Sequence, residues 1–399
     1  MQIDRTVQIP SSPHNRPPRT RHVLSWADAA VGLVIVAVAA AIALNVQSNM
    51  AAAGIQPGFS FLAQQAGFDL SESLIPYNAS ESYLRAIAAG LVNTIAVAVA
   101  SLALASAVGL LFGLLSVSPA RLGRLLALAY VELFRNLPKI LVLLVIFVFA
   151  VNGLPTIRQA LVFGPLTVSN RAIYLPWLQN APRNMHWLLS CLLLVPGLIW
   201  LWIRQASRHQ GRTGRRAPVL GVAILIAIAV PAMLAVVLGA PLGLSRPTLA
   251  GFSIKGGIAI SIQFCTVVIA LGLYHGAQIA EVLRGGIEAI PRGQIEAAAA
   301  LGLKGGQTTR LVVVPQVLRA VVPPLNNQFA NLLKNTSISI AVGYSDLMSV
   351  AGTTINQTFR PMETMLITMS IYLLLCLALT GALNLWSARI GAREGRKTR

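Results

Sequence analysis

Long apolar stretches alternate with short polar segments along almost the whole chain. A helix that crosses a membrane needs about 20 mainly apolar residues. About eight stretches come near that length. Their approximate ranges are 24–46, 87–117, 137–153, 186–203, 218–238, 258–282, 321–343 and 364–386. The pattern predicts an all-α fold, a polytopic membrane helix bundle of about eight transmembrane helices.

The composition supports the membrane interpretation. Of the 399 residues, 55% are hydrophobic and only 11% are charged, and the mean hydropathy is +0.70. Soluble domains carry about 25% charged residues, so a soluble enzyme is excluded. Cys191, Cys265 and Cys376 each lie inside an apolar stretch, so we expect them to be small apolar side chains rather than disulfide partners or metal ligands.

The positive charge lies in short clusters between the apolar stretches. The net charge is +19, from 31 Lys+Arg and 12 Asp+Glu. Nucleic-acid binding would require a charged soluble face, and we expect none, whereas basic loops are typical of the cytoplasmic side of an inner-membrane protein. With eight spans, five basic regions fall on one side: the segment before the first span, 118–139, 204–216, 283–320 and the tail after the eighth span. We therefore expect a bacterial inner-membrane protein with both termini in the cytoplasm.

The pattern also suggests a division of the chain. Residues 1–23 are predicted to be a disordered cytoplasmic tail, 24–86 an extra N-terminal span with an external loop, and 87–399 the transmembrane domain, with an insertion at 154–250. A cleaved signal peptide is the alternative for 24–46, but its apolar run is longer than the usual 7–15 residues. Four segments rich in Pro, Gly, Asn and Ser are predicted to be external loops: 47–86, 154–185, 239–257 and 344–363.

Motifs for catalysis are missing from the sequence. It has no phosphate-binding glycine loop, no dinucleotide-binding glycine motif after a strand, and no zinc-binding helix motif. We therefore expect no enzyme activity, no metal site and no cofactor in this chain. A conduit is the better interpretation, with energy from an ion gradient or from another subunit.

One polar segment, 283–320, contains an unusual stretch, "EAAAALGLKGGQTTRLVVVPQ", Glu296 to Gln316. Glu296 to Leu301 should be helical, and Gly302 should end that helix, with the break continuing through residues 304–306. Thr308 or Thr309 should cap a second helix, which Pro315 should kink or end. The result is an exposed, largely apolar helical hairpin. It could dock on a partner or pack on its own protein.

The spacing in this hairpin resembles a family signature. Glu296-Ala297-Ala298, then Gly302, then nine residues, then Val312 to Pro315, resembles the EAA signature of ABC-importer permeases, with valines in place of its Ile and Leu. The resemblance implies that the loop docks on an ATPase subunit. It assigns that coupling role to Glu296, Ala297, Ala298, Gly302 and Pro315.

Other stretches resemble permeases for polar amino acids: "YVELFRNLP", "PPLNNQFANLLKNTSI" and "GYSDLMSV". This resemblance covers about 85–399, while the first span and the insertion are similar to the larger permease of broad-specificity L-amino-acid importers. Lys139 and His275 depart from the family pattern, which usually has an apolar and a small residue there. "YVELFRNLP", with Glu132 and Arg135, is expected to form an amphipathic elbow on the cytoplasmic surface.

The resemblance implies a type I ABC-importer permease fold and a permease subunit of an ATP-driven amino-acid importer. Its implied partners are a second permease subunit, a dimer of ATPase subunits, a periplasmic amino-acid-binding protein, membrane lipid and the amino-acid substrate. Two alternatives stay open: an ABC permease for another small polar solute, or an ion-driven secondary transporter, although no convincing inverted repeat is present.

Polar side chains inside the spans are candidates for the substrate path. One helical face of span 258–282 and another of span 321–343 carry the candidates Tyr274, Gln278, Glu281, Asn327, Asn331 and Lys334. Lys334 should lie about 15 Å into the bilayer, where it meets either the carboxylate of a substrate or a permanent counter-ion. The asparagines could instead join helices, Tyr274 could pack, and Glu281 could pair with Arg284.

Overall fold

The computed structural model describes residues 26–52, 58–178, 191, 194–206, 219–237, 244–251 and 253–395. By contacts the chain forms two compact units, Met1–Phe59 and Ser60–Arg399.

The first unit contains helix α1, Trp26–Ala52. Its sequence carries apolar residues around the whole circumference, and its most apolar part is Ala30–Ile42. A helix that is apolar on all sides is typical of a segment surrounded by lipid. The described part of the predicted span 24–46, residues 26–46, is thus helical.

The second unit is mainly helical, as the hydrophobic pattern predicts. Its α-helices are α2 (Tyr83–Ser116), α3 (Arg121–Asn136), α4 (Lys139–Gly153), α6 (Val219–Val237), α7 (Ile262–Glu288), α8 (Arg292–Ala300), α9 (Gly305–Thr308), α10 (Val314–Asn335), α11 (Leu347–Thr358) and α12 (Pro361–Gly395). Short 3₁₀ segments are η1 (Ser60–Ala63), η2 (Ile157–Gln159) and η5 (Thr336–Val342), and η4 (Thr309–Val313) is a π-helical turn. Residues 194–206 are also helical.

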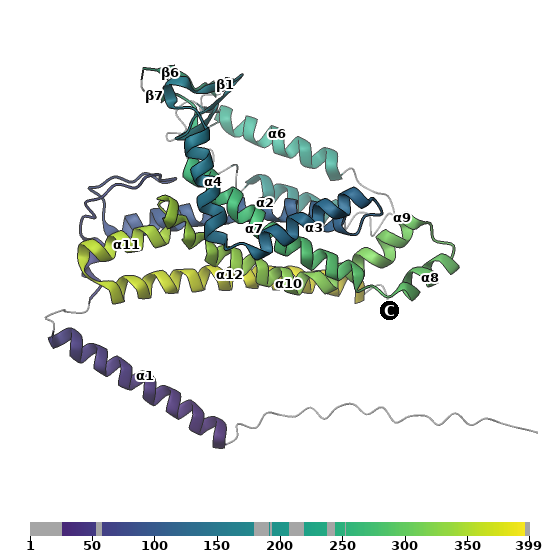
Figure 1. The fold of residues 1–399 in the computed structure, drawn as a ribbon, viewed down its shortest axis with the longest axis horizontal. Coiled ribbons are helices and arrows are strands. Elements are labelled where there is room, and N and C mark those ends of the chain that lie inside the picture. The colour runs from purple at the N-terminus through teal and green to yellow at the C-terminus, as the bar shows by residue number, and fades with distance from the viewer. Residues whose placement is uncertain are drawn as a thin grey trace, which may run out of the picture. The chain divides into compact units, whose positions relative to one another are not determined.

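The centre of this unit is the pair α2 and α7, which lie side by side (Figure 1). Glycines let the two helices approach closely. A Cβ on Gly109 would lie 2.5 Å from Ile279 Cγ2, and one on Gly113 would lie 2.9 Å from Leu283 Cβ. Small residues four apart on one helix are a common device for close packing in membranes. Any larger side chain at Gly109 or Gly113 would push α7 away.

The number of spans differs from the expectation. In the described part of the chain, α2, α7 and Pro361–Leu385 of α12 are each long and apolar enough to cross a membrane. Two bent pairs raise the number to at most five: α3 with α4, at 106°, and Gly305–Val342 with α11, at 56°. The predicted spans 137–153 and 321–343 are therefore parts of bent pairs rather than straight helices.

Two predicted spans in the insertion are shorter or incompletely described. The range 218–238 corresponds to α6, whose apolar stretch, Gly221–Leu234, is shorter than a full span. The range 186–203 lies partly outside the described residues, although 194–203 is helical.

The loop prediction for 154–185 and 239–257 was wrong. These segments contain the strands β1 (Leu161–Phe163), β2 (Leu166–Val168), β3 (Ala172–Leu175), β4 (Trp177–Leu178), β5 (Leu244–Ser245), β6 (Thr248–Ala250) and β7 (Ser253–Lys255), and β8 (Ile258–Ser261) follows directly after them. An antiparallel sheet has the order β1-β2-β3-β8, and β4-β5 and β6-β7 form separate pairs. Branched and aromatic side chains in "LTV", "AIYL" and "IAIS" favour strands, but Gly and Pro nearby masked that signal.

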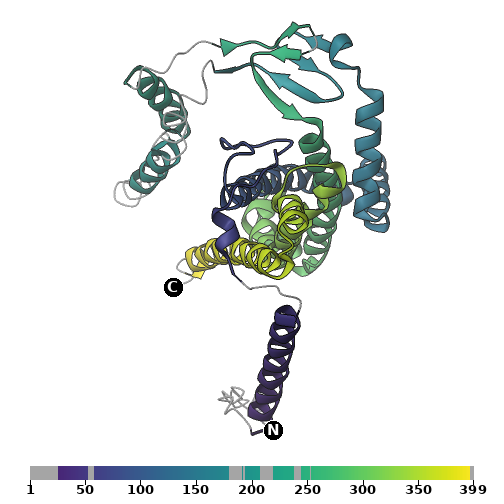
Figure 2. The same ribbon diagram turned by 90° about the vertical axis from the view of Figure 1, so that its left-hand side faces the viewer.

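The sheet stands where the chain leaves α4 and enters α7 (Figure 2). β3 and β8 pair over four residues, from Ala172 with Ser261 to Leu175 with Ile258. The predicted span 258–282 therefore begins as a strand, and its helix starts at Ile262. Ser261 caps that helix, because its hydroxyl accepts a hydrogen bond from Phe264 N at 3.0 Å.

Residues 60–82, predicted as part of an external loop, pack against the bundle. Phe61 and Ala66 are buried in one apolar cluster with Tyr83, Leu347 and Val350. The loop backbone is closed by hydrogen bonds, such as Gly67 N to Ala79 O at 2.9 Å. This segment is therefore fixed against one end of α2 and α11.

Candidate functional site

The helical hairpin begins where the sequence places it. α8, Arg292–Ala300, ends at Leu301, and Gly302 adopts the left-handed conformation with φ +74°. Leu303 N donates to Ala298 O at 3.1 Å and Gly302 N donates to Ala299 O at 2.9 Å. This pair of hydrogen bonds is the Schellman motif, which requires a positive φ and so favours glycine. The prediction that Gly302 ends the first helix is confirmed.

The second helix starts earlier than predicted. α9 begins at Gly305, and Lys304 is its N-cap residue, whose backbone N donates to Gln307 Oε1 at 2.9 Å. Thr309 Oγ1 donates back to Gly305 O at 3.0 Å and caps nothing. The predicted break through 304–306 and the threonine cap were both wrong. The Gln307 side chain satisfies the open helix end, so the two glycines are tolerated inside the first turn.

Pro315 does not end the second helix. The chain stays helical from Gly305 to Val342. Proline cannot donate the backbone hydrogen bond to the residue four positions earlier. The π-helical turn η4 precedes it, with Val314 N bonded to Thr309 O, and Pro315 then sits in the first turn of α10. A π turn at this point accommodates the missing donor.

The hairpin surface is apolar and exposed at its turn. Leu301 is 81% exposed and Leu311 is 62% exposed. Glu296, Ala297 and Gly302 are exposed, Pro315 is half-buried, and Ala298 is buried. A cleft of about 590 Å³ beside the turn is lined by Lys304, Gly306, Gln307, Arg310 and Leu311. The hairpin thus packs on its own protein at Ala298 and leaves its tip free for a partner.

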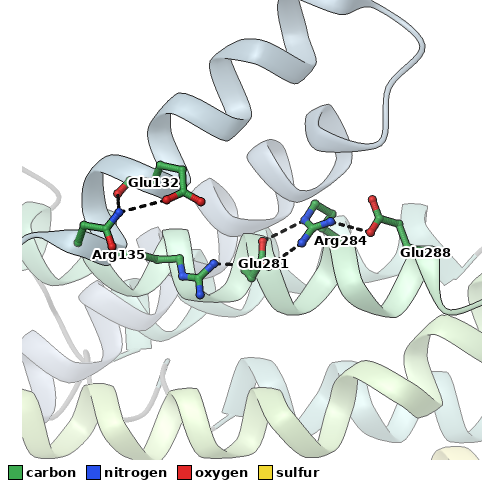
Figure 3. Close-up of polar contacts among 6 residues, drawn as sticks. Glu132, Arg135, Glu281, Arg284 and Glu288 are labelled. Carbon is green, nitrogen blue, oxygen red and sulfur yellow. Dashed lines mark hydrogen bonds and ion pairs between the residues drawn. The ribbon is translucent and has the colours of Figure 1, made fainter.

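A chain of ion pairs links α3 to the end of α7 that leads into the hairpin (Figure 3). Glu281 accepts two hydrogen bonds from Arg284, at 2.7 and 3.0 Å, and lies 3.5 Å from Arg135 Nη1. Arg284 also donates to Glu288 at 2.6 Å. Of the two interpretations of Glu281, the structure contains the salt bridge with Arg284.

The elbow predicted at "YVELFRNLP" is present, because α3 meets α4 there at a bend of 106°. These residues form the second half of α3, which packs against α2 and α7. Tyr130 stacks on Phe112 with ring centroids 4.1 Å apart, and its hydroxyl donates to Leu273 O at 2.6 Å. This hydrogen bond fixes α3 to α7, a contact that the amphipathic pattern alone does not predict.

A polar cluster of three helices lies inside the bundle. Asn335, at the end of α10, accepts a hydrogen bond from Lys139 Nζ, and its Nδ2 lies 3.0 Å from His275 Nε2. His275 is only 2% exposed. Because the Asn335 amide nitrogen donates, His275 Nε2 must accept and the other ring nitrogen carries the proton. Lys139 and His275 therefore meet at one asparagine, a relationship that only the fold reveals.

The other candidates for the substrate path do not form one site in this chain. Tyr274 and Gln278 are half-buried on α7, and Asn327 and Asn331 are exposed on α10. Within the described residues, the side chains of Gln278, Asn327 and Asn331 make no hydrogen bond, and the Tyr274 ring packs edge-on against His275. The asparagines are available to a neighbouring chain or a solute.

Lys334 is exposed at the end of α10 and lines a cavity of about 440 Å³ that α12 closes on one side. The same cavity is lined by Ser337, Tyr372, Cys376 and three methionines. In the part of the chain that the structure describes, the Lys334 ammonium forms no ion pair. None of the described acidic side chains therefore acts as the permanent counter-ion that was expected as one alternative.

Comparison with known proteins decides the family. The family model for the binding-protein-dependent transport system inner membrane component matches residues 105–391. The chain belongs to this family. It is therefore a transport component of a membrane protein complex and is not itself an enzyme.

Curated relatives match across most of this family member. A putative amino-acid ABC transporter permease of Escherichia coli is 36% identical over 88% of this chain and 89% of its own. A general L-amino acid transport system permease of Rhizobium johnstonii is 35% identical over 88% of both chains. A permease of a glutamate/glutamine/aspartate/asparagine transport system from Rhodobacter capsulatus is 36% identical over 88% of this chain.

Proposed function

We propose that this chain is a permease subunit of an ATP-driven amino-acid importer in the bacterial inner membrane. The observation that carries the proposal is the match over most of the chain to three relatives whose names all state amino-acid transport. That match covers 88% of this chain, so it reaches beyond residues 105–391, which the family model matches.

The hairpin supports an energy source outside this chain. A tip with Leu301 81% exposed, at the end of a helix fixed by Ala298, is suited to enter a cleft on a partner. The residues assigned to coupling are Glu296, Ala297, Ala298, Gly302 and Pro315. The unbroken helix from Gly305 to Val342 would carry movement of the hairpin into the bundle, and ATP would be hydrolysed by two separate ATPase subunits.

The remaining partners follow from the same proposal. A second permease would complete the path by facing the cavity that Lys334 lines. A periplasmic amino-acid-binding protein would deliver the solute. Both termini and the basic segment 283–320 would then lie in the cytoplasm. Lys334, Asn331, Asn327, Tyr274 and Gln278 remain candidates for the path. The Lys334 ammonium, without an ion pair in the described residues, is suited to attract a substrate carboxylate.

Purification and uptake together test this proposal. The chain is tagged, purified from native membranes with its partners, and reconstituted into liposomes with and without internal ATP. We expect an ATPase to co-purify, and uptake of tritiated amino acids to require ATP and to survive collapse of the ion gradients. Uptake that follows an ion gradient without ATP would support a secondary transporter. ATP-dependent uptake of a peptide or osmolyte, without uptake of any amino acid, would show that the substrate is another small polar solute.

A further inference from the structure

A second cleft lies where the insertion sheet meets the bundle. It has a volume of about 590 Å³ and is bounded by residues 71–72, the last turns of α4, the turn between β2 and β3, and the junction of β8 with α7. Its polar lining includes Glu72, Asn170, Arg171, Ser261 and Gln263, and its apolar lining includes Phe147, Val151 and Ile262. A mostly apolar cleft with a few polar groups is the usual form of a small-molecule site.

Glu72 is held at this cleft by hydrogen bonds to three parts of the bundle. The buried amide of Asn93 on α2 donates to Glu72 O at 2.8 Å and to Ser345 O at 2.8 Å. Ser71 N, next in the chain, donates to Ser345 Oγ at 2.9 Å. Ser261 at the start of α7 donates to the Glu72 carboxylate. These contacts fix the carboxylate while leaving part of it open to the cleft.

Arg171 is held by its backbone, and within the described residues its guanidinium has no partner. Its carbonyl accepts a hydrogen bond from Ile262 N at 2.9 Å, where the sheet joins α7. Its side chain is exposed, and neither Arg171 nor Glu72 forms an ion pair with any residue that the structure describes. Two opposite charges therefore line one cleft without neutralising each other.

We propose that this cleft binds a free amino acid as a zwitterion, with Glu72 facing its α-ammonium and Arg171 facing its α-carboxylate. The inference rests on the proposed function, since it names a site for the same substrate class on the side of the bundle opposite the hairpin. Arg binds carboxylates through a planar fork of donors, and a fixed carboxylate with a free lone pair accepts from an ammonium. The apolar walls contact the substrate side chain and do not select for a charge on it.

The proposal is tested by binding to the purified complex without the binding protein. Dissociation constants are measured for tritiated L-leucine, L-glutamine and L-glutamate on the wild type, Glu72→Gln and Arg171→Met. We expect both variants to weaken binding by about ten- to hundredfold, because each leaves a charged group of the ligand without its charged partner. Arg171→Lys retains a cation and should recover part of the affinity.

Matched controls come from the same region. Glu81→Gln and Arg246→Met change exposed residues that do not line the cleft, and binding to them should stay within about twofold of the wild type. Co-purification of the ATPase and an unchanged melting temperature show that each variant is folded. Arg171 is exposed, so its truncation removes no core packing.

The outcomes separate this inference from the proposed function. If the wild-type complex imports amino acids but both cleft variants bind them as the wild type does, the cleft assignment is wrong and the function stands. If the variants change only the concentration of binding protein that half-saturates uptake, these residues dock the binding protein and the assignment is again wrong. If the wild type neither binds nor imports any amino acid, both proposals fail.

Discussion

Arg135 of α3 and Glu281 of α7 lie 3.5 Å apart, and the same carboxylate holds Arg284 through two shorter hydrogen bonds. The contact joins the helix before the 106° bend to the helix that leads into the hairpin. Its members are about one-third exposed, from 29% for Glu281 to 42% for Arg135. An ion pair at that exposure stabilises a fold by about 1 kcal/mol or less.

This relationship gives Glu281 a structural role. We expect Glu281→Gln and Arg135→Met to lower the stability of the purified complex by similar small amounts, about 0.5–1 kcal/mol each. The double variant should cost less than the sum, since both changes break one contact. Thermal unfolding in detergent measures this. A strong rise in the KM for substrate with unchanged stability would instead place Glu281 on the substrate path.

The hairpin gives the second prediction. Gly302 has φ +74° and open space around it, so Gly302→Arg adds backbone strain of about 1–2 kcal/mol and a bulky charge at the docking tip. We expect the chain to insert and assemble, while uptake falls and ATP hydrolysis no longer follows substrate.

Gly251 supplies the matched control for that substitution. It has φ +64°, has nothing within 4 Å of an added Cβ, and lies in the turn between β6 and β7. Gly251→Arg therefore carries the same strain away from the hairpin and should keep uptake coupled to ATP hydrolysis. Equal loss in both variants would show that strain, and not docking, explains the effect.

The polar cluster gives the third prediction. Asn335→Leu leaves Lys139 and His275 without their shared partner inside the bundle, so we expect a loss of about 1–3 kcal/mol of stability. Lys139→Leu should cost less when Asn335 is already leucine, which a double-mutant cycle measures. The control Asn326→Leu breaks an exposed pair with Asn384, and should change stability by about 0.5 kcal/mol at most. Additive costs would contradict a shared cluster.

Lys334 gives the fourth prediction. We expect Lys334→Met to impair uptake without preventing assembly, because the ammonium lines a cavity and forms no ion pair in the described residues. The initial rate of ATP-driven uptake measures this, with Lys255→Met on β7 as an exposed control of the same chemistry. Normal uptake by Lys334→Met would remove the idea that Lys334 meets a substrate carboxylate.

The cleft also predicts a pH dependence. Burial raises the pKa of Glu72 above its ordinary 4.5, and the hydrogen bond from Ser261 offsets this only in part. Amino-acid binding should therefore weaken as the pH falls through this raised pKa, because the protonated carboxyl no longer attracts an ammonium. The charged and titratable groups near Glu72 include Arg171, Cys265 and Tyr344, which do not ordinarily titrate in that acidic range. Asp346, next to Ser345, is a second carboxyl, and burial raises its pKa to about 6, so the Glu72→Gln variant is the control that assigns the titration.

Acidification has opposite effects on binding and on folding stability at Glu72, and this difference separates a loss of binding from unfolding. A carboxyl whose pKa is raised by folding prefers to be protonated in the folded state, so acidification stabilises the fold at this group. Binding measured against pH should fall in the wild type and stay low and flat in Glu72→Gln. A decline of the same shape in that variant would show that another group titrates.

The hydrophobic pattern was sufficient for the fold class, because apolar stretches long enough to cross a membrane can satisfy their backbone there only as helices or closed barrels, and stretches of this length fit helices. The sequence was also sufficient for the end of α8. The helix-forming residues Glu296 to Leu301 are followed by Gly302, and this order determines the local hydrogen bonds that end the helix. The start of α9 was missed because a side chain, Gln307, satisfies the open amides. Pro315 does not end its helix because a π turn absorbs the lost donor, which no local rule anticipates.

Contacts between distant segments could not be inferred from the sequence. Asn335, Lys139 and His275 are far apart in sequence and meet only because α4, α7 and α10 converge. Glu72 and Arg171 line one cleft because β3 pairs with β8 at the start of α7. The short strands of the insertion were overlooked because each has only two to four residues, too few for a period-2 pattern to stand out.

The most direct test of the account asks where energy enters this chain. Two single-cysteine variants are made in a cysteine-free background: Leu301→Cys at the hairpin tip and Leu249→Cys on β6. The native leucines are 81% and 56% exposed. Each variant is treated with a short bifunctional cross-linker in the intact complex. We expect an ATPase subunit to be captured at Leu301→Cys and not at Leu249→Cys. Capture of the ATPase at position 249, or its absence at position 301 in a complex that hydrolyses ATP, would contradict the docking of the ATPase on this hairpin.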